Sequence, residues 1–249
     1  MHSFTGGADG GFSQEDDNLI LDQFGDLYGT TANGGSTACP FGCGVVFKLN
    51  ASGEETVLHS FTGGTDGADP FAGLVRDAAG IFYGSTESGT VNGAGVVFRL
   101  TPAGDLLVLH SFTGGSDGGC SFGSLILDRS GNLYGAAGCG GAFPGAGAIF
   151  KLSPAGRDTV LYNFTGGNDG SGPVGPLVRD ASGNLYGVTE FGGASGQGVV
   201  FKLDPSGNET VLHAFAGGAD GAVRTAGVTR DASGNLYAPR LAAAPSAQV

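Results

Sequence analysis

The chain has 249 residues, 51 of them glycine, and a formal net charge of −12 at pH 7 with only 11 Lys and Arg. A surface this acidic repels phosphate backbones and anionic lipid headgroups, which argues against nucleic acid or a membrane surface as a partner. No apolar run approaches the roughly 18 residues needed to span a bilayer, and the glycines follow no Gly-X-Y period, so membrane insertion and collagen are excluded too.

One phrase returns along the chain. The segment 57–67, Val-Leu-His-Ser-Phe-Thr-Gly-Gly-Thr-Asp-Gly, recurs slightly edited at 108–118, 160–170 and 211–221, and its tail occupies 2–10. A fixed period of tens of residues is the mark of a repeat architecture. We therefore expect residues that recur once per unit to serve the unit, and residues that break the pattern to be the better candidates for unique chemistry.

Each unit contains four short runs that predict β-strands. In the second unit these runs are 56–61, 73–77, 81–84 and 96–100, which are rich in β-branched, aromatic and Leu residues and are bounded by Gly, Pro, Asn, Asp and Ser. No helical periodicity extends beyond a turn or two. The second run recurs at 18–22, 124–128, 176–180 and 227–231, the third around each Tyr-Gly or Tyr-Ala pair, and the fourth around Phe47, Phe150 and Phe201.

The connections alternate between short turns and long glycine-rich loops. The second and third runs are joined by Asp-x-x-Gly, where glycine supplies the positive φ of a tight hairpin, whereas 113–122 and 136–147 are long. Alternate connections of an antiparallel sheet lie on the same edge. We therefore expect all the long loops to lie on one face, which we call the long-loop face. A binding site, if the protein has one, is predicted on this face.

Four antiparallel strands per unit of about 50 residues predict an all-β, five-bladed β-propeller in a single domain spanning 1–249. The second run is placed nearest the axis and the first outermost, giving blades 18–61, 72–112, 124–164 and 176–215. The fifth blade is incomplete: its outer strand would come from His2–Phe4, which closes the ring, and its third strand from 239–249. An open fragment of a larger propeller is the alternative. The repeat units are 2–52, 56–104, 107–156, 159–207 and 210–238, followed by a degenerate tail, 239–249.

The three linked phrases Leu-His-Ser-Phe-Thr-Gly-Gly-x-Asp-Gly, Gly-Asn-Leu-Tyr-Gly and Gly-x-Val-Phe-Lys-Leu resemble those of the bacterial GloVer tandem-repeat family over residues 2 to about 238. The resemblance implies an extracellular or surface-associated repeat protein and brings no catalytic residues with it. The chain as given shows no signal peptide, because Met1 leads straight into the repeat phrase.

Carboxylates on the predicted long-loop face are candidates for metal binding and catalysis. The recurring loop aspartates are expected to form turns, with Ca²⁺ binding as the alternative if the loops converge. They are Asp9, Asp66, Asp117, Asp169 and Asp220. Glu87 and Glu190 break the pattern at matching positions, and two carboxylates across a mouth could hydrolyse glycosides. No other cofactor is expected. The four histidines share one repeat position, which favours a structural role.

The cysteines depart most clearly from the repeat. Cys120 and Cys139 lie in two long loops of one blade, so a disulfide between them is geometrically natural and leaves Cys39 with Cys43. Two disulfides would fit an oxidising compartment. Reduced thiols in a cytosolic protein, or a four-thiolate zinc site, are the alternatives.

Five phenylalanines of the loops are candidate stacking platforms for a sugar. They are Phe41, Phe71, Phe122, Phe143 and Phe191, and Phe191 beside Glu190 is the best local pair. Covers over the blade core are the competing interpretation.

We predict an exported, monomeric, non-catalytic binding or structural module whose partner, a glycan or another surface protein, is not identified by the sequence. A lectin-like glycan binder is the first alternative. A carbohydrate-active hydrolase or lyase using Glu87 and Glu190 is the second.

Overall fold

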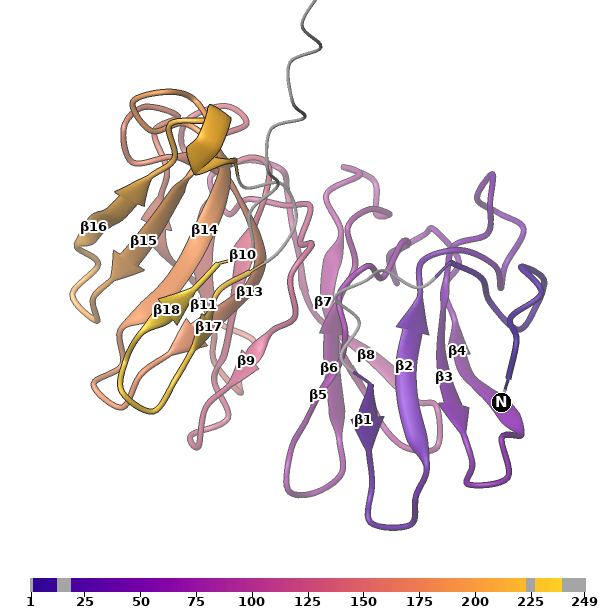
Figure 1. Cartoon of the computed structure of the whole chain (residues 1–249). Coiled ribbons are helices and arrows are strands. Elements are labelled where there is room, and N and C mark those ends of the chain that lie inside the picture. The colour runs from indigo at the N-terminus through magenta and orange to yellow at the C-terminus, as the bar shows by residue number, and fades with distance from the viewer. Residues whose placement is uncertain (1, 13–18, 223–226, 239–249) are drawn as a thin grey trace, which may run out of the picture.

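The computed structural model describes residues 2–12, 19–222 and 227–238, and within them the only helical element is a three-residue 3-10 turn, η1 (Gly218–Asp220). The strands form four four-stranded sheets and one two-stranded sheet (Figure 1). The first two sheets contain β1 (Ile20–Leu21), β2 (Leu27–Thr31), β3 (Val45–Leu49), β4 (Glu55–Ser60), β5 (Val75–Arg76), β6 (Phe82–Ser85), β7 (Val96–Leu100) and β8 (Leu106–Ser111). The others contain β9 (Ile126–Leu127), β10 (Leu133–Ala137), β11 (Ala148–Leu152), β12 (Asp158–Asn163), β13 (Ser171–Arg179), β14 (Leu185–Phe191), β15 (Val199–Leu203), β16 (Glu209–Ala214), β17 (Thr229–Arg230) and β18 (Leu236–Tyr237).

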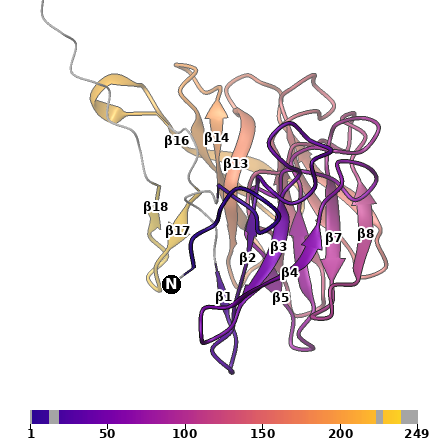
Figure 2. The ribbon, with the colours of Figure 1, turned by 90° about the vertical axis from the view of Figure 1, so that its right-hand side faces the viewer.

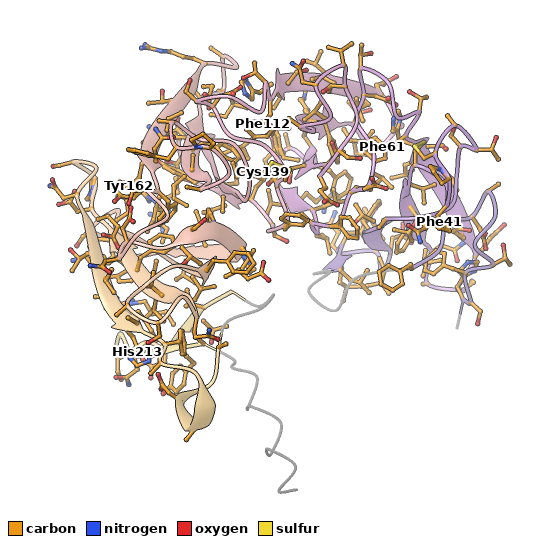
Figure 3. All side chains as sticks on the ribbon, turned by 90° about the horizontal axis from the view of Figure 1, so that it is seen from above. Phe41, Phe61, Phe112, Cys139, Tyr162 and His213 are labelled. Atoms are coloured by element: carbon orange, nitrogen blue, oxygen red, sulfur yellow. A yellow bond between two sulfur atoms is a disulfide. The ribbon has the colours of Figure 1, made fainter. Side chains whose placement is uncertain are left out.

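Within every four-stranded sheet each strand pairs antiparallel with the next strand in the chain. The first strand of one sheet contacts the first strand of the next, as β9 contacts both β5 and β13. Seen from above, the sheets follow one another along an arc from the one beside Phe41 to the one that carries His213 (Figure 3). The predicted all-β fold of four-stranded antiparallel sheets is therefore confirmed.

The fifth sheet is short. Within the described residues β17 and β18 pair only with each other, and Val228 packs with Phe215 and Val188 against the sheet β13–β16. Figures 1 and 2 show the hairpin beside that sheet. The third strand predicted from 239–249 lies outside the described residues. Closure of the ring by His2–Phe4 stays a prediction, because among the described residues these three pair with no strand.

The repeated phenylalanine joins neighbouring sheets. Phe61, just after β4, packs edge-on against Phe98 of β7 in the next sheet, with ring centroids 5.3 Å apart, and both side chains are fully buried. Phe112 meets Phe150 in the same way at 5.2 Å. An edge-to-face aromatic pair contributes about 0.5–1.5 kcal/mol beyond the burial of its surface. This explains why the phrase returns once per unit.

The glycine after the repeated tyrosine makes room for that phenylalanine. A Cβ atom on Gly135 of β10 would lie 2.4 Å from the ring of Phe150 on the adjacent strand β11. Equivalent glycines face Phe47, Phe98 and Phe201 at 2.5–2.8 Å. Only glycine leaves room for the tip of the phenylalanine ring at these positions.

The hairpin aspartates are turn formers. Asp128 Oδ1 accepts the backbone N–H groups of Ser130 and Asn132, and its Oδ2 accepts the Tyr134 hydroxyl at 3.1 Å. The same tyrosine bond occurs at Asp22, Asp77, Asp180 and Asp231. These bonds fix the short turns, so the face opposite the long loops is built from closed hairpins.

Candidate functional site

The long connections β2–β3, β6–β7, β10–β11 and β14–β15 gather at one end of the sheets, the long-loop face, which Figure 3 views from above. The loops that follow β4, β8, β12 and β16 open toward the same end, since Ala68 bridges to Ser88 and Gly119 to Cys139. The face therefore collects the residues that break the repeat.

The loop aspartates are each held within their own loop. Asp66 Oδ2 accepts the Thr62 backbone N–H at 3.0 Å and lies 3.2 Å from His59 Nε2, while its other oxygen accepts the Thr62 hydroxyl. Asp169 is held in the same way by Thr165, with the Tyr162 hydroxyl replacing the histidine at 3.0 Å. Among the described residues no two of these aspartates belong to one group of metal-ligating side chains.

One pair of facing positions on the long-loop face holds different residues in each sheet. Asp69 faces Ser88, whose hydroxyl donates to Asp69 Oδ2 at 2.5 Å, and in the next sheet the same pair of positions holds the Cys120–Cys139 disulfide. Asp69 and Cys120 have φ of 55° and 51°, in the left-handed region that non-glycine residues rarely occupy. Left-handed non-glycine residues cluster at functional sites, because the surrounding structure must hold them there.

Both predicted disulfides are present, Cys120–Cys139 and Cys39–Cys43, and no cysteine remains free. The first joins the two loops that flank the hairpin β9–β10, as the sequence indicated, and Figure 3 places Cys139 near the middle of the arc. Because all four cysteines are paired, the alternatives of a four-thiolate zinc site and of reduced thiols are wrong.

Glu87 is the most perturbed carboxyl group on the long-loop face. It lies two residues beyond the end of β6, and its backbone N–H donates to the Asp69 carbonyl at 3.0 Å, which holds the two acidic residues side by side. Burial raises the pKa of Glu87 to about 7, and the negative charge of Asp69 adds to the increase. A group with a pKa near neutrality exists in both protonation states under physiological conditions, as a general acid or base must.

Glu190 occupies the matching position in β14 and is half-buried. In the intervening sheet the matching position is Gly138. The ring of Phe122 packs against this glycine, since a Cβ atom there would lie 3.0 Å from a ring carbon. The pattern-breaking pair therefore lies in alternate sheets, as the sequence indicated.

One of the five candidate aromatic residues, Phe71, lies in the same loop as Asp69, and its ring lies near that of a second, Phe122. Phe71 is tied to Asp69 by its backbone N–H, which donates to the Asp69 carbonyl at 2.9 Å, and its ring lies 6.3 Å from that of Phe122. Phe122 is 38% exposed. The long-loop face thus carries acidic groups and partly exposed aromatic rings in neighbouring loops.

The other three candidate rings are exposed. They are Phe41, Phe143 and Phe191. Phe41 borders a pocket of about 650 Å³ that Phe12 and Asn33 also line. Phe191 lies against Gly172, where a Cβ would be 3.4 Å from its ring.

Asp69 is the residue that the sequence analysis missed. It replaces Cys120 and Gly172 of other units, so a position-by-position comparison of the repeats would have marked it as a departure, as it marked Glu87. The pairing of Asp69 with Glu87 arises only where two loops 18 residues apart meet at the Ala68–Ser88 bridge.

The chain belongs to the Gloeobacter/Verrucomicrobia repeat family, whose pattern it matches over residues 14–242. This confirms the family resemblance inferred from the three phrases. No curated protein matches the sequence.

Solved structures with a similar fold include the periplasmic gluconolactonase of Pseudomonas aeruginosa, which is 18% identical with a TM-score of 0.51 over 90% of this chain and 64% of that one. Another is a protein described as a gluconolactonase, with 14% identity, a TM-score of 0.51, and coverage of 88% and 69%. A third is the extracellular domain of BT4673 from B. thetaiotaomicron, with 11% identity, a TM-score of 0.53, and coverage of 88% and 25%. The chain thus spans about two thirds of the gluconolactonases and a quarter of the third structure. At these identities the similarity shows a shared propeller-like fold.

The comparison contradicts the predicted non-catalytic binding or structural module. Gluconolactonases are hydrolases, so the structures that share this fold favour the alternative of a hydrolase over the main prediction. The sequence favoured a structural role because most of its residues recur once per unit.

Two observations bear on the compartment. The disulfides are typical of oxidising, extracytoplasmic environments, and one structural neighbour is an extracellular domain. In the described part of the chain we find no helix with the length and apolar character to cross a bilayer.

Proposed function

We propose that this protein is an exported hydrolase that opens a strained or activated carbonyl linkage of a carbohydrate, with a sugar lactone as the first substrate class, and that Glu87 is its general base. The observation that carries the proposal is the pKa of about 7 of Glu87, which stands beside Asp69 on the long-loop face. The names of the fold's gluconolactonases support the choice of substrate class.

The proposed reaction uses the two protonation states of one carboxyl group. Ionised Glu87 accepts a proton from a water molecule while the water oxygen attacks the lactone carbonyl. The ring C–O bond then breaks, and the proton returns from Glu87 to the leaving alkoxide, so that water is added across the ester. General base catalysis of this kind contributes about 10²–10⁴-fold to a rate.

Asp69 and the nearby rings have separate parts in the proposal. Asp69 holds its own orientation through the Ser88 hydroxyl and keeps Glu87 from ionising at low pH. Phe71 and Phe122 offer an apolar platform on which the carbon face of a sugar ring can stack.

The test is hydrolysis of a panel of aldonolactones, followed in a weakly buffered solution by the release of acid. We expect kcat/KM to rise with pH through about 7, and Glu87→Gln to reduce kcat by at least about 10²-fold while the fold persists. Glu209→Gln is the matched control, because burial also raises the pKa of Glu209 to about 7 but the residue starts β16, away from the long-loop face.

Either of two outcomes would overturn the assignment. One is full activity in Glu87→Gln. The other is saturable sugar binding that Phe71→Ala abolishes but that no lactone, ester or glycoside converts to turnover, which would identify a lectin-like protein instead.

A further inference from the structure

Outside the proposed hydrolase site, titratable side chains also gather where neighbouring sheets meet at their outer edges. Each outermost strand begins with a residue that adjoins the histidine position and loop aspartate of the preceding unit. At the first junction this residue is Glu55, whose Oε2 lies 3.4 Å from His2 Nε2. The corresponding residues at the later junctions are Leu106, Asp158 and Glu209.

The first junction collects three ligand-type side chains in a small volume. His2 Nε2 also lies 3.9 Å from Asp9 Oδ2, and one donor atom from each of the three residues lies within 4.8 Å of the other two. The side chains of His2, Asp9 and Glu55 are only 20%, 19% and 10% exposed. The group is therefore largely shielded from water, although it consists of three polar residues.

Two atoms of this group have no hydrogen-bond partner among the described residues. They are His2 Nε2 and Glu55 Oε1, and both are inaccessible to solvent. A buried polar atom without a partner costs about 1–3 kcal/mol, and such atoms in native structures need an explanation. The Glu55 side chain is nine-tenths buried, and its Oε1 has no hydrogen-bond partner, while its Oε2 and Asp9 are within ion-pair distance of His2 Nε2. A cation between the three side chains would give the unpartnered oxygen and nitrogen one common partner.

The donor set and its spacing fit a divalent transition metal. Zinc binds imidazole nitrogen and carboxylate oxygen at about 2.0–2.2 Å, which puts two ligands of a tetrahedral site about 3.3 Å apart. The observed 3.4 Å and 3.9 Å need only small adjustments. Asp9 accepts the Thr5 backbone N–H at 2.8 Å and the Thr5 hydroxyl, which orients its carboxylate and leaves further lone pairs for a metal.

We propose that His2, Asp9 and Glu55 form a binding site for a divalent transition-metal ion such as Zn²⁺, which fastens the N-terminal segment to the outer strand β4. Calcium is disfavoured, because it takes six to eight oxygen ligands and this site offers an imidazole and two carboxylates. The site is independent of the proposed hydrolase centre, since it shares no residue with it.

The other junctions show which part of the arrangement is special. At the second, Leu106 supplies no ligand and His59 Nε2 is within 3.2 Å of Asp66 instead. At the fourth, Tyr162 replaces the histidine and donates to Asp169. The third has His110, Asp117 and Asp158, and there too His110 Nε2 and Asp158 Oδ1 lack a hydrogen-bond partner. Asp158 is one methylene shorter than Glu55, however, and across the described residues only the first junction brings three donors together.

The experiment is isothermal titration of Zn²⁺ into the untagged, chelator-treated full chain, with thermal unfolding measured in parallel. We expect one equivalent of Zn²⁺ and a rise in Tm of several degrees at saturation, since a ligand that binds only the folded state stabilises it. His2→Ala and Glu55→Gln should each weaken binding by at least tenfold, and they should remove the rise in Tm. His59→Ala, at the same repeat position, is the matched control and should keep both.

A gain-of-site variant makes the test independent of any loss of folding. Leu106→Glu gives the second junction the donor set of the first, so the stoichiometry should rise from one to two. Three outcomes would overturn the proposal: no saturable Zn²⁺ binding, equal losses in His2→Ala and His59→Ala, or a preference for Ca²⁺ over Zn²⁺ at the same residues.

Discussion

The two disulfides should contribute unequally to stability, in proportion to the loops that they close. Cys120–Cys139 joins residues 19 apart, whereas Cys39–Cys43 joins residues only 4 apart. In the chain-entropy treatment of the unfolded state these loops correspond to about 3.2 and about 1.9 kcal/mol at 25 °C. Replacing both cysteines of the longer bridge by serine should therefore lower the free energy of unfolding by about 1.3 kcal/mol more than the same change in the shorter bridge.

A second variant separates the covalent link from the contact that it replaces. The neighbouring sheet uses Asp69 and Ser88 at the positions of Cys120 and Cys139. Cys120→Asp with Cys139→Ser should recover about 1 kcal/mol relative to the double serine variant, because a side-chain hydrogen bond is worth about that much. Aspartate also tolerates the left-handed backbone at position 120, where φ is 51°, better than most residues do.

The assay is urea denaturation of all four proteins under non-reducing conditions, with slope and midpoint fitted separately. An unchanged slope attributes the shifts in midpoint to stability. If loss of the Cys39–Cys43 bridge destabilises the protein as much as loss of Cys120–Cys139, loop length does not set the contributions of the two disulfides. If the aspartate–serine variant is no more stable than the double serine variant, the two side chains do not form at positions 120 and 139 the hydrogen bond that Asp69 and Ser88 form in the neighbouring sheet.

Two further predictions concern pH and packing. Burial raises the pKa of Glu209 to about 7, so the contribution of this side chain to stability is fully present below about pH 4.5 and is lost as the pH rises through 7. The urea midpoint of Glu209→Gln should therefore equal that of the wild type at pH 4.5 and exceed it increasingly up to pH 8. Gly135→Ala should destabilise the protein by about 1–3 kcal/mol, because the added methyl group clashes with the ring of Phe150. Adding Phe150→Leu should restore part of this loss. If the unfolding free energies of the two changes simply add in a double-mutant cycle, the two residues do not pack against each other in this way.

The sequence alone was enough to predict the unit and its strands, because both depend on local chemistry. Short runs of β-branched, aromatic and Leu residues predict the strands, and the Asp-x-x-Gly turns predict the hairpins, so sheets such as β5–β8 follow from any one repeat. The pairing of Cys120 with Cys139 followed as well, since two loops of one antiparallel sheet must emerge at the same end.

Contacts between units could not be predicted in this way. The packing of Phe61 on Phe98 depends on how far one sheet is rotated against the next, and no pattern within a repeat specifies that rotation. The same rotation places Glu55 against His2, 53 residues earlier in the chain.

The function depends most strongly on contacts between distant parts of the chain. The sequence marked Glu87 as a departure from the repeat, but the pKa of a carboxyl group depends on the burial and the charges around it, and only the folded loops place Asp69 beside it. Local periodicity therefore determined the strands, the hairpins and the sequence of sheets. The tertiary structure decided which of the few non-repeating residues meet, because each such meeting joins parts of the chain that no short-range rule connects.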